Sequence, residues 1–590
     1  MTMPKMIHLT IDGMETQAEA GSTILQAAET VGVHIPTLCY MNLHELGFEN
    51  RPASCRICVV EVAGRRNLAP ACATPVAEGM VVRTNTAKVQ EARRTVMELL
   101  LSDHPKDCLT CDKSGQCELQ AMAENLGIRK IRITGKAMST YPMDSSDSIV
   151  RDPDKCIMCR RCENVCNQIQ TVGALSAVNR GFDAVVSTAF NEPIRNTVCV
   201  GCGQCVQACP VGALTVKSDL DRVIEALNDP EKVVVVNTAP AVRVALGEEF
   251  GYEPGSIVTG QMAAALRRLG FNYVFDTDFA ADMTIMEEAH ELVGRLTAFL
   301  KGEKAALPLL TSCCPAWVNF LETQFPDMLD LPSSAKSPME MFGATAKSYF
   351  AEKIGVDPAK MVTVSIMPCT AKKAEARREE MGRNGIADID ISLTTTELAE
   401  LIKQMNLDLW EMEEEDFDDP MGESTGAAVI FGKTGGVMEA ALRTAYEWVT
   451  GKSLEKIEFE EIRTTSYGIK EAHVAVGDVT LNVAVASGLG NARALMEEIK
   501  NGNPRQLHAV EIMACPGGCV NGGGQPRHFG DLSIVSDRQR ALYEADQDKE
   551  IRKSHENPSI QKVYAEYFGE PGSEKAHHLL HTRYQGKEKI

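Results

Sequence analysis

Cysteines are the residues of this chain whose spacing says most about its chemistry. The 590 residues include 20 cysteines, and nineteen of them can be placed in sets spaced like iron-sulfur cluster ligands. The remaining one, Cys313, is adjacent to the candidate ligand Cys314, so no pair is left for a disulfide. Chains that keep their thiols reduced work in reducing compartments. We therefore expect a cytoplasmic protein with several iron-sulfur clusters.

The strongest local signal is an internal repeat within residues 150–217. The pattern Cys-x2-Cys-x2-Cys-x3-Cys begins at Cys156 and recurs from Cys199. In bacterial two-cluster ferredoxins with this spacing, the fourth cysteine of each run ligates the other cluster. The repeat therefore predicts two 4Fe-4S centres. Their ligand sets would be Cys156, Cys159, Cys162 and Cys209 for one, and Cys199, Cys202, Cys205 and Cys166 for the other.

Two further sets of candidate ligands precede the repeat. The first suits a 2Fe-2S centre, although its first gap of fifteen residues exceeds the plant-type spacing. The second combines one imidazole with three thiols and fits either zinc or a 4Fe-4S cluster. Its position between two cluster-binding segments favours the 4Fe-4S cluster, and zinc is the alternative for both sets. The members are Cys39, Cys55, Cys58 and Cys72 in the first set, and His104, Cys108, Cys111 and Cys117 in the second.

Five cysteines in the second half of the chain follow predicted buried strands. They lie in three segments, each of which begins where an apolar run ends. In open α/β sheets, ligands gather at the carboxyl ends of the strands, so we expect the three segments to converge. Four thiols suffice for a 4Fe-4S cluster, and the fifth must have another role. The cysteines are Cys313, Cys314, Cys369, Cys515 and Cys519.

The elements that position these residues change in type along the chain. An N-terminal hairpin turning at Asp12-Gly13 precedes a predicted helix from a Ser22 cap to Val31. Beyond residue 220, apolar runs alternate with helical patterns, which is typical of an α/β core. The predicted strands there are 233–237, 273–276, 308–311, 362–366, 428–431, 483–486 and 510–513. The predicted helices include 89–101, 219–227, 262–269, 437–449 and 492–499.

Charge and composition exclude several classes of partner. The formal charge of −21 argues against nucleic acid or an anionic membrane surface. No apolar run approaches the roughly 18 residues that a membrane span needs, and the N-terminus alternates as a strand does instead of resembling a signal peptide. The run Glu411–Asp419 is expected to be a solvated loop. The polar, His-rich end is expected to be a short helical tail packed on the core, with zinc binding as the alternative.

Three motifs resemble the signatures of the iron-iron (FeFe) hydrogenases. They are Thr311-Ser312-Cys313-Cys314-Pro315-Ala316-Trp317, Met367-Pro368-Cys369-Thr370-Ala371-Lys372-Lys373 and the segment Val510–Pro526 with its two cysteines and three successive glycines. The resemblance covers nearly the whole chain. It implies an H-cluster whose 4Fe-4S part is ligated by Cys314, Cys369, Cys515 and Cys519. By the same resemblance, Cys519 also bridges to a di-iron unit that carries CO, CN and a dithiolate amine.

The resemblance also assigns roles around that di-iron unit. Cys313 is implied as the proton donor to the amine, and Lys372 as the donor to a cyanide. The proton path maps onto Glu288, Glu291 and Ser333. Without the motifs, the two glutamates would be read as a solvated i, i+3 face of a helix. The residues implied to contact the cofactor are Met367, Met513, Ala239 and Pro240.

The implied fold is multidomain and the implied activity is reversible H2 chemistry. Electrons would pass through one 2Fe-2S and three 4Fe-4S clusters. The expected parts are a β-grasp 2Fe-2S domain (1–87), a small His/Cys3 4Fe-4S domain (88–140), a two-cluster bacterial ferredoxin-like domain (141–220), an α/β H-cluster domain (221–526) and a short C-terminal small-subunit-like tail (527–590).

The electron partner is the least determined expectation. The N-terminal domains are similar to those of catalytic subunits in multimeric, NAD(P)-linked, electron-bifurcating hydrogenases, and a monomeric ferredoxin-dependent enzyme is the alternative. No Gly-x-Gly-x-x-Gly follows a strand here, so flavin or nicotinamide chemistry is expected in partner subunits. A non-catalytic iron-sulfur assembly scaffold is a third reading. It gives no reason to keep Cys313, Lys372 and the glutamates together.

Overall fold

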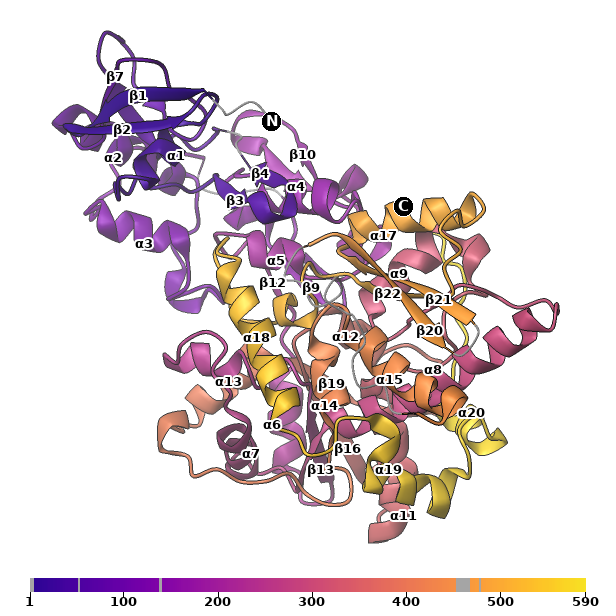
Figure 1. Cartoon of the computed structure of the whole chain (residues 1–590). Coiled ribbons are helices and arrows are strands. Elements are labelled where there is room, and N and C mark those ends of the chain that lie inside the picture. The colour runs from indigo at the N-terminus through magenta and orange to yellow at the C-terminus, as the bar shows by residue number, and fades with distance from the viewer. Residues whose placement is uncertain (1–4, 51–52, 137–140, 453–466, 477–478, 590) are drawn as a thin grey trace.

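The computed structural model describes residues 5–50, 53–136, 141–452, 467–476 and 479–589. Its N-terminal part is a five-stranded sheet in the order β2-β1-β7-β5-β6, at one end of the molecule (Figure 1). The predicted hairpin is confirmed, with Asp12 and Gly13 both at positive φ in the turn. The strands are β1 (Met6–Ile11), β2 (Met14–Glu19), β5 (Val59–Val62), β6 (Ala69–Pro70) and β7 (Met80–Arg83), and β3 (Met41–Leu43) pairs with β4 (Phe48–Asn50).

The first helix, α1 (Ile24–Glu29), begins one residue later than predicted. Its cap is Thr23 and not Ser22, because Thr23 can form both halves of a capping box with Gln26. The following cluster-binding segments are built from short elements joined by turns. These are α2 (Ala87–Ser102), α3 (Glu118–Asn125), α4 (Arg161–Asn164) and α5 (Gln204–Ala208), with β8 (Asp144–Ser145), β9 (Ile149–Arg151), β10 (Ser176–Val178), β11 (Val185–Ser187) and β12 (Leu214–Val216).

The α/β core contains two four-stranded sheets. The first, in the order β14-β13-β16-β19, is parallel throughout, and the second, β15-β22-β21-β20, has only its edge strand β20 antiparallel. Phe275, on β14 of the first sheet, is buried in one hydrophobic core with Phe342, and Trp317 and Phe320 are buried in a second core. The strands are β13 (Val233–Thr238), β14 (Tyr273–Asp276), β15 (Leu309–Leu310), β16 (Met361–Met367), β19 (Ile391–Thr394), β20 (Ile469–Val476), β21 (Val479–Ser487) and β22 (Ala509–Met513), beside the small hairpin β17 (Gly382–Arg383) and β18 (Ile386–Ala387).

One predicted strand of the core was wrong. Residues 428–431 lie in α14 (Gly426–Val429) and the 3-10 turn that follows it. A short apolar run that is buried on all sides carries no periodicity, so its pattern cannot separate strand from helix. Here the buried Asp282 accepts hydrogen bonds from the backbone N–H and hydroxyl of Thr425 at the start of α14, and α14 packs against α8, α15 and α18.

Helices cover both sheets and link them. The long helix α8 (Thr277–Leu300) contacts α10, α14, α15 and α19, and its first half is almost entirely buried. The other core helices are α6 (Leu220–Asn228), α7 (Thr259–Arg268), α9 (Pro315–Gln324), α10 (Pro338–Thr345), α11 (Ala351–Ile354), α12 (Ala371–Glu375), α13 (Thr395–Gln404), α15 (Gly436–Thr450) and α17 (Leu489–Lys500). Across the described ranges, no helix has the length and apolar character needed to cross a membrane.

The C-terminal tail is helical and packs on the core, as predicted. It consists of α18 (Ser533–Gln547), α19 (Pro558–Val563) and α20 (Glu574–Leu580), drawn in yellow in Figure 1, which contact α14, α8 and α10 respectively. His581, directly after α20, forms an isolated β-bridge with Ala335 of the core. The acidic run is a loop, as expected, but it is tied to the core, because Arg267 pairs with Glu415 and Asp418.

The ferredoxin-like segment meets the core through backbone. A Cβ on Gly203 would lie 2.8 Å from the Cα of Gly523, and a Cβ on Gly523 would lie 2.6 Å from the Cα of Gly203. The Thr370 hydroxyl donates to the carbonyl of Gly201 at 2.7 Å. This glycine junction, Gly203 with Gly523, therefore leaves no space for any side chain between the two parts.

Candidate active site

The three cysteine segments converge between the two sheets. Strands β15 and β22 are neighbours in one sheet, whereas β16 belongs to the other, and their carboxyl ends surround a single cavity. The predicted site residues that line it are Ala239, Pro240, Cys313, Cys314, Met367, Cys369, Lys372, Met513 and Cys519.

The loop after β22 is held around the cavity by close backbone packing. Gly518 has a φ of +103°, and a Cβ there would lie 2.5 Å from the backbone nitrogen of Thr434. At Gly522, a Cβ would lie 2.0 Å from the carbonyl oxygen of Pro368. Any side chain at either position would push the loop away from the other walls, which explains the glycines around Cys515 and Cys519.

Of the four cysteines assigned to one cluster, Cys314, Cys369 and Cys515 are buried, and Cys519 is partly exposed and lines the cavity. Burial first, and then the thiols of Cys369 and Cys314, raise the pKa of Cys515 well above its usual range. Burial also raises the pKa of Cys369 to about 12, with Cys314 as the next cause. A group of buried thiolates needs a compensating cation, and iron supplies that charge in cysteine-ligated clusters. The donor set therefore fits an iron-sulfur cluster.

Lys372 reaches the cavity wall from α12. Its Nζ lies 2.6 Å from Glu375 Oε2 and 3.2 Å from the carbonyl oxygen of Cys313. Burial has the largest single effect and would lower the pKa of Lys372, but the Glu375 carboxylate and, after it, the thiols of Cys369 and Cys313 together raise this pKa. Lys372 therefore remains a cation in an otherwise apolar cavity.

Glu288, Glu291 and Ser333 lie close together behind Cys313. Ser333 Oγ donates to Glu291 Oε2 at 2.8 Å, and Arg295 pairs with Glu291 Oε1 at 2.6 Å. Glu288 is 3% exposed, and one of its oxygens has no hydrogen-bond partner among the described residues. The structure therefore excludes the alternative in which Glu288 lies on a solvated helix face.

The remaining cysteine sets are also brought together. One cavity is lined by Cys156, Cys159, Cys162 and Cys209, so the fourth cysteine of the second run joins the first three of the other. The thiols of Cys202, Cys199 and Cys166 in turn raise the pKa of Cys205, after burial. Near the N-terminus, Cys58 Sγ lies 3.4 Å from Cys72 Sγ. Burial, and then Cys111 and Cys108, raise the pKa of Cys117. His104 has a buried Nδ1 with no hydrogen-bond partner among the described residues.

Five family models match the chain in the order of these parts. Their descriptions are 2Fe-2S iron-sulfur cluster binding domain (4–87), NADH-ubiquinone oxidoreductase-G iron-sulfur binding region (93–132), 4Fe-4S dicluster domain (155–213), iron only hydrogenase large subunit, C-terminal domain (232–523), and iron hydrogenase small subunit (532–587). NADP-reducing hydrogenase subunit HndD of Solidesulfovibrio fructosivorans is 58% identical over 586 residues, covering 99% of this chain and 100% of that protein. The chain belongs to the iron-only hydrogenase family.

Two other hydrogenases extend the similarity. Iron hydrogenase 1 of Clostridium pasteurianum is 40% identical over 587 residues, which cover 98% of this chain and all of that protein. The solved structure of a variant of the hydrogenase HydA1 from Chlamydomonas reinhardtii has 45% identity and a TM-score of 0.56, and covers 63% of this chain and 99% of that chain. This chain is therefore an iron-only hydrogenase, an oxidoreductase with 2Fe-2S, 4Fe-4S ferredoxin-like and H-cluster domains.

Two buried glutamates of the hydrogenase were missed by sequence reasoning. Glu511 accepts the backbone N–H groups of Gly435 and Met438, so it holds the start of α15 against β22. Burial raises the pKa of Glu511 to about 7. The sequence signal for Glu511 was a charged residue inside the apolar run of β22. For Glu375, the partner of Lys372, the only sequence signal was the i, i+3 spacing between the two residues.

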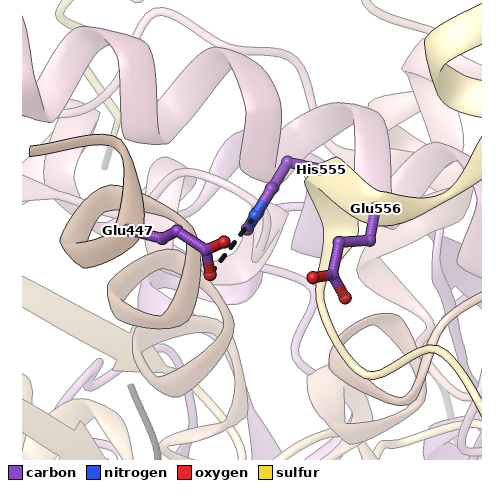
Figure 2. Close-up of side chains that lie close together, drawn as sticks. All are labelled: Glu447, His555 and Glu556. Carbon is purple, nitrogen blue, oxygen red and sulfur yellow. Dashed lines mark ion pairs between the residues drawn. The ribbon is translucent and has the colours of Figure 1, made fainter. Parts of the chain in front are cut away.

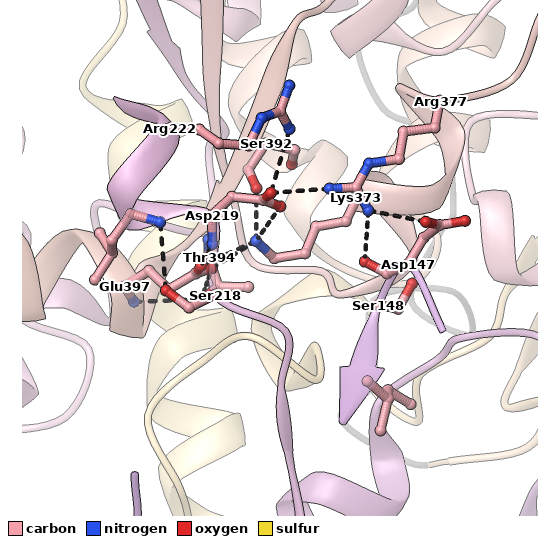
Figure 3. Close-up of polar contacts among 12 residues, drawn as sticks. Asp147, Ser148, Ser218, Asp219, Arg222, Lys373, Arg377, Ser392, Thr394 and Glu397 are labelled. Carbon is pink, nitrogen blue, oxygen red and sulfur yellow. Dashed lines mark hydrogen bonds and ion pairs between the residues drawn. The ribbon is translucent and has the colours of Figure 1, made fainter. Parts of the chain in front are cut away.

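A polar network also anchors α12 behind the site (Figure 3). Lys373 has a fully buried side chain, and its Nζ bonds to Asp219 Oδ2, Glu397 Oε1 and the carbonyl of Ser392. Arg377 bonds to Asp219 and also to Asp147 of the ferredoxin-like segment. The network therefore joins the segment that carries Lys372 to the ferredoxin-like segment through Asp147, and to the α/β core through Glu397.

One other group in the described residues has the spacing of a metal site. Glu447, His555 and Glu556 point toward one another (Figure 2). The ammonium of Lys553 lies 2.7 Å from Glu447 Oε2 and 3.0 Å from Glu556 Oε1. Because this cation already compensates both carboxylates, we assign no metal to the group.

Replacing Glu288 by Gln should stabilise the hydrogenase at alkaline pH. Burial, and then Glu291, raise the pKa of Glu288 from 4.5 to about 8, so the folded chain keeps a proton that the unfolded chain loses between these values. The native state therefore loses stability as pH rises through that window. A neutral Gln avoids the loss, and we expect the variant to gain up to about 3 to 5 kcal/mol above pH 8 and nothing below pH 4.5. Thermal unfolding across this range measures the difference, and a pH-independent difference would contradict the assignment.

Proposed function

We propose that this hydrogenase interconverts H2 with protons and electrons at an H-cluster in the cavity between the two sheets. The observation that carries the proposal is one cavity that joins Cys314, Cys369 and Cys519 to the non-ligand thiol Cys313, with Cys515 buried beside them. Cys314, Cys369, Cys515 and Cys519 would hold the 4Fe-4S part, and Cys519 would also bridge to the di-iron unit. When bound, this group supplies the irons at which H2 forms and splits and an amine that accepts a proton.

The chain's own residues would move the protons and shape the cavity. Cys313 would hold a proton at Sγ, and Glu288 would exchange protons with it, since the Glu288 carboxylate lies close enough to raise the pKa of the thiol. Ser333 and Glu291, joined by a 2.8 Å hydrogen bond, would continue the route outward. Lys372 would donate to a cyanide from the cavity wall. Met367 and Met513 would pack there and exclude water, and Ala239 and Pro240 complete the same wall.

Electrons would travel through clusters in the first four of five domains, whose boundaries we expect at residues 87, 140, 220 and 526. We assign one 2Fe-2S cluster to the N-terminal cysteines and three 4Fe-4S clusters to the sets that follow. Cys202 lies near both Cys369 and Cys515. After burial, the Cys369 thiol contributes to the raised pKa of Cys202, and the Cys202 thiol contributes to that of Cys515. The ferredoxin-like segment is thus suited to deliver electrons to the cavity.

The physiological partner is proposed from the relatives. A protein named as a subunit of an NADP-reducing hydrogenase matches this chain end to end, which favours an NAD(P)-linked complex with further subunits. We propose in addition that this complex is cytoplasmic and electron-bifurcating, with flavin in the other subunits. A monomeric ferredoxin-dependent enzyme is the second candidate. The native mass of the purified protein separates the two, because only the first candidate predicts additional subunits.

Anaerobic purification with a matured active site tests the proposed reaction. We expect one 2Fe-2S and three 4Fe-4S signals by electron paramagnetic resonance, CO and CN bands by infrared spectroscopy, and H2 production with a reduced viologen dye. A fully loaded protein without H2 production or uptake would overturn the proposal.

A further inference from the structure

Glu287, which the proposed proton route does not use, faces the C-terminal tail. It is fully buried and accepts hydrogen bonds from the Tyr564 hydroxyl and the backbone N–H of Gly572. The third contact is with His581, whose Nε2 lies 2.9 Å from Glu287 Oε2. A carboxylate at this position places the ring proton on Nε2 and leaves Nδ1 as the nitrogen that can gain or lose one.

The ring of His581 is held in place on its other side as well. Its Nδ1 lies 2.8 Å from Ser334 Oγ. Thr582 donates to the carbonyl of Ser334, and Lys336 donates to the carbonyl of Leu580, so the tail runs beside residues 334–336. The imidazole is 6% exposed and stacks on the exposed ring of His577 at a centroid distance of 4.7 Å.

The hydroxyl of Ser334 has one hydrogen and two acceptors. One acceptor is Nδ1 of His581, and the other is Glu291 Oε2 at 3.4 Å. When the imidazole is neutral, Nδ1 accepts the hydroxyl hydrogen. When the imidazole is protonated, Nδ1–H donates to Ser334 Oγ, and the hydroxyl hydrogen is free to turn to Glu291.

We propose that His581 is a positioning residue for proton transfer, and that its ionisation sets the proton affinity of Glu291 through the Ser334 hydroxyl. Glu291 already accepts from Ser333 Oγ and from the backbone N–H of Ser334. A further donor favours the ionised carboxylate. Protonated His581 therefore makes Glu291 a stronger acid, which promotes proton delivery inward and disfavours proton uptake from the site. The role in turnover rests on the proposed function.

Charged and titratable groups surround this contact from several elements. Glu287 of α8 faces the ring directly, with Tyr564 behind it, and His577 stacks on the ring from α20. Glu291 and its partner Arg295 lie across Ser334.

The substitution His581→Gln tests the proposal in the purified holoenzyme. The glutamine amide can donate to Glu287 and accept from Ser334. The variant therefore mimics the neutral imidazole but cannot ionise. Infrared difference spectroscopy follows the protonated carboxyl band of Glu291, identified by its absence in Glu291→Gln. At pH values where His581 is charged, we expect the variant to raise the proton affinity of Glu291 by roughly threefold to tenfold.

Two further variants guard against misfolding and non-specific effects. Ser334→Ala keeps the backbone donor but removes the hydroxyl, and it should change the Glu291 titration as His581→Gln does. His577→Gln should leave the titration unchanged. Titration curves that coincide in wild type, His581→Gln and Ser334→Ala would overturn the proposal, and so would an equal change in His577→Gln.

Turnover provides the second readout. At low pH, His581→Gln should lower the ratio of H2 production to H2 oxidation by roughly threefold to tenfold, with the two rates unchanged at high pH. A merely structural role would lower both rates at every pH and would overturn the proposal. The infrared result stands whether or not the wild type makes H2, so failure of the proposed function is distinguishable from failure of this inference.

Discussion

The substitution Cys313→Ala is expected to lower H2 production and uptake by at least about 100-fold and to leave the iron content unchanged. A positioned proton donor contributes on the order of 100-fold to 10,000-fold to a rate. Cys313 lines the cavity beside Cys314, and burial, together with the nearby Glu288, raises the pKa of its thiol, so it holds its proton. The alanine variant loses this proton but keeps the backbone carbonyl that Lys372 contacts.

Iron analysis, infrared CO and CN bands and a viologen-linked H2 assay measure this result. Ser312→Ala is the matched control. Ser312 precedes Cys313 in the sequence, and its hydroxyl donates to the carbonyl of Ala335. The control should retain turnover within about tenfold, as expected when a single neutral hydrogen bond is lost. If Cys313→Ala also retained turnover within that range with a full iron complement, Cys313 could not be the proton donor.

The substitution Lys373→Met is expected to lower the thermal unfolding temperature by roughly 3 to 8 °C. It removes a fully buried ammonium and leaves the carboxylates of Asp219 and Glu397 facing an apolar side chain. Removing one partner of a buried ion pair costs about 3 to 5 kcal/mol. Although burial opposes the effect, Lys373 and then Arg377 lower the pKa of Asp219. The stability lost in the variant is therefore present above the usual pKa of an aspartate and disappears at lower pH, as the carboxylate protonates in the folded chain.

Unfolding followed by the loss of iron-sulfur absorbance measures the temperature. The matched control is Arg222→Met, because Arg222 bonds to the same Asp219 but has a half-exposed side chain. Solvent screens the half-exposed Arg222, so its pair with Asp219 contributes less than the buried Lys373 does, and the control should unfold closer to the wild type. Equal temperatures for the two variants would show that the buried network does not stabilise the hydrogenase.

The local patterns of this chain were predictable because each depends on neighbours in sequence. Ligand spacings such as that of Cys156–Cys166 and apolar runs such as Val233–Asn237 need no knowledge of the fold. The strand ends at Cys314, Cys369 and Cys515 could be placed at one site by a general rule of α/β sheets. The run 428–431 failed because burial on all sides removes the periodicity that separates helix from strand.

Other features depend on contacts between distant segments. The burial of Glu288 follows from neighbours around α8, which no helical pattern specifies. Glu511 holds α15 from 73 residues away, and Lys373 joins Asp219 and Glu397 across three elements. His581 meets Glu287 at a separation of 294 residues. Such contacts become visible only after the chain has folded.

The glycine junction sets a limit on rebuilding this enzyme from modules. Tunnelling rates fall exponentially with separation, and at Gly203 and Gly523 the two segments already touch at their Cα atoms. In a foreign electron-donating module, any larger residue at the position of Gly203 would collide with Gly523 and increase the distance between the module and the core. Grafting experiments on this chain should therefore carry both glycines together with Thr370, as one matched unit that belongs to neither domain alone.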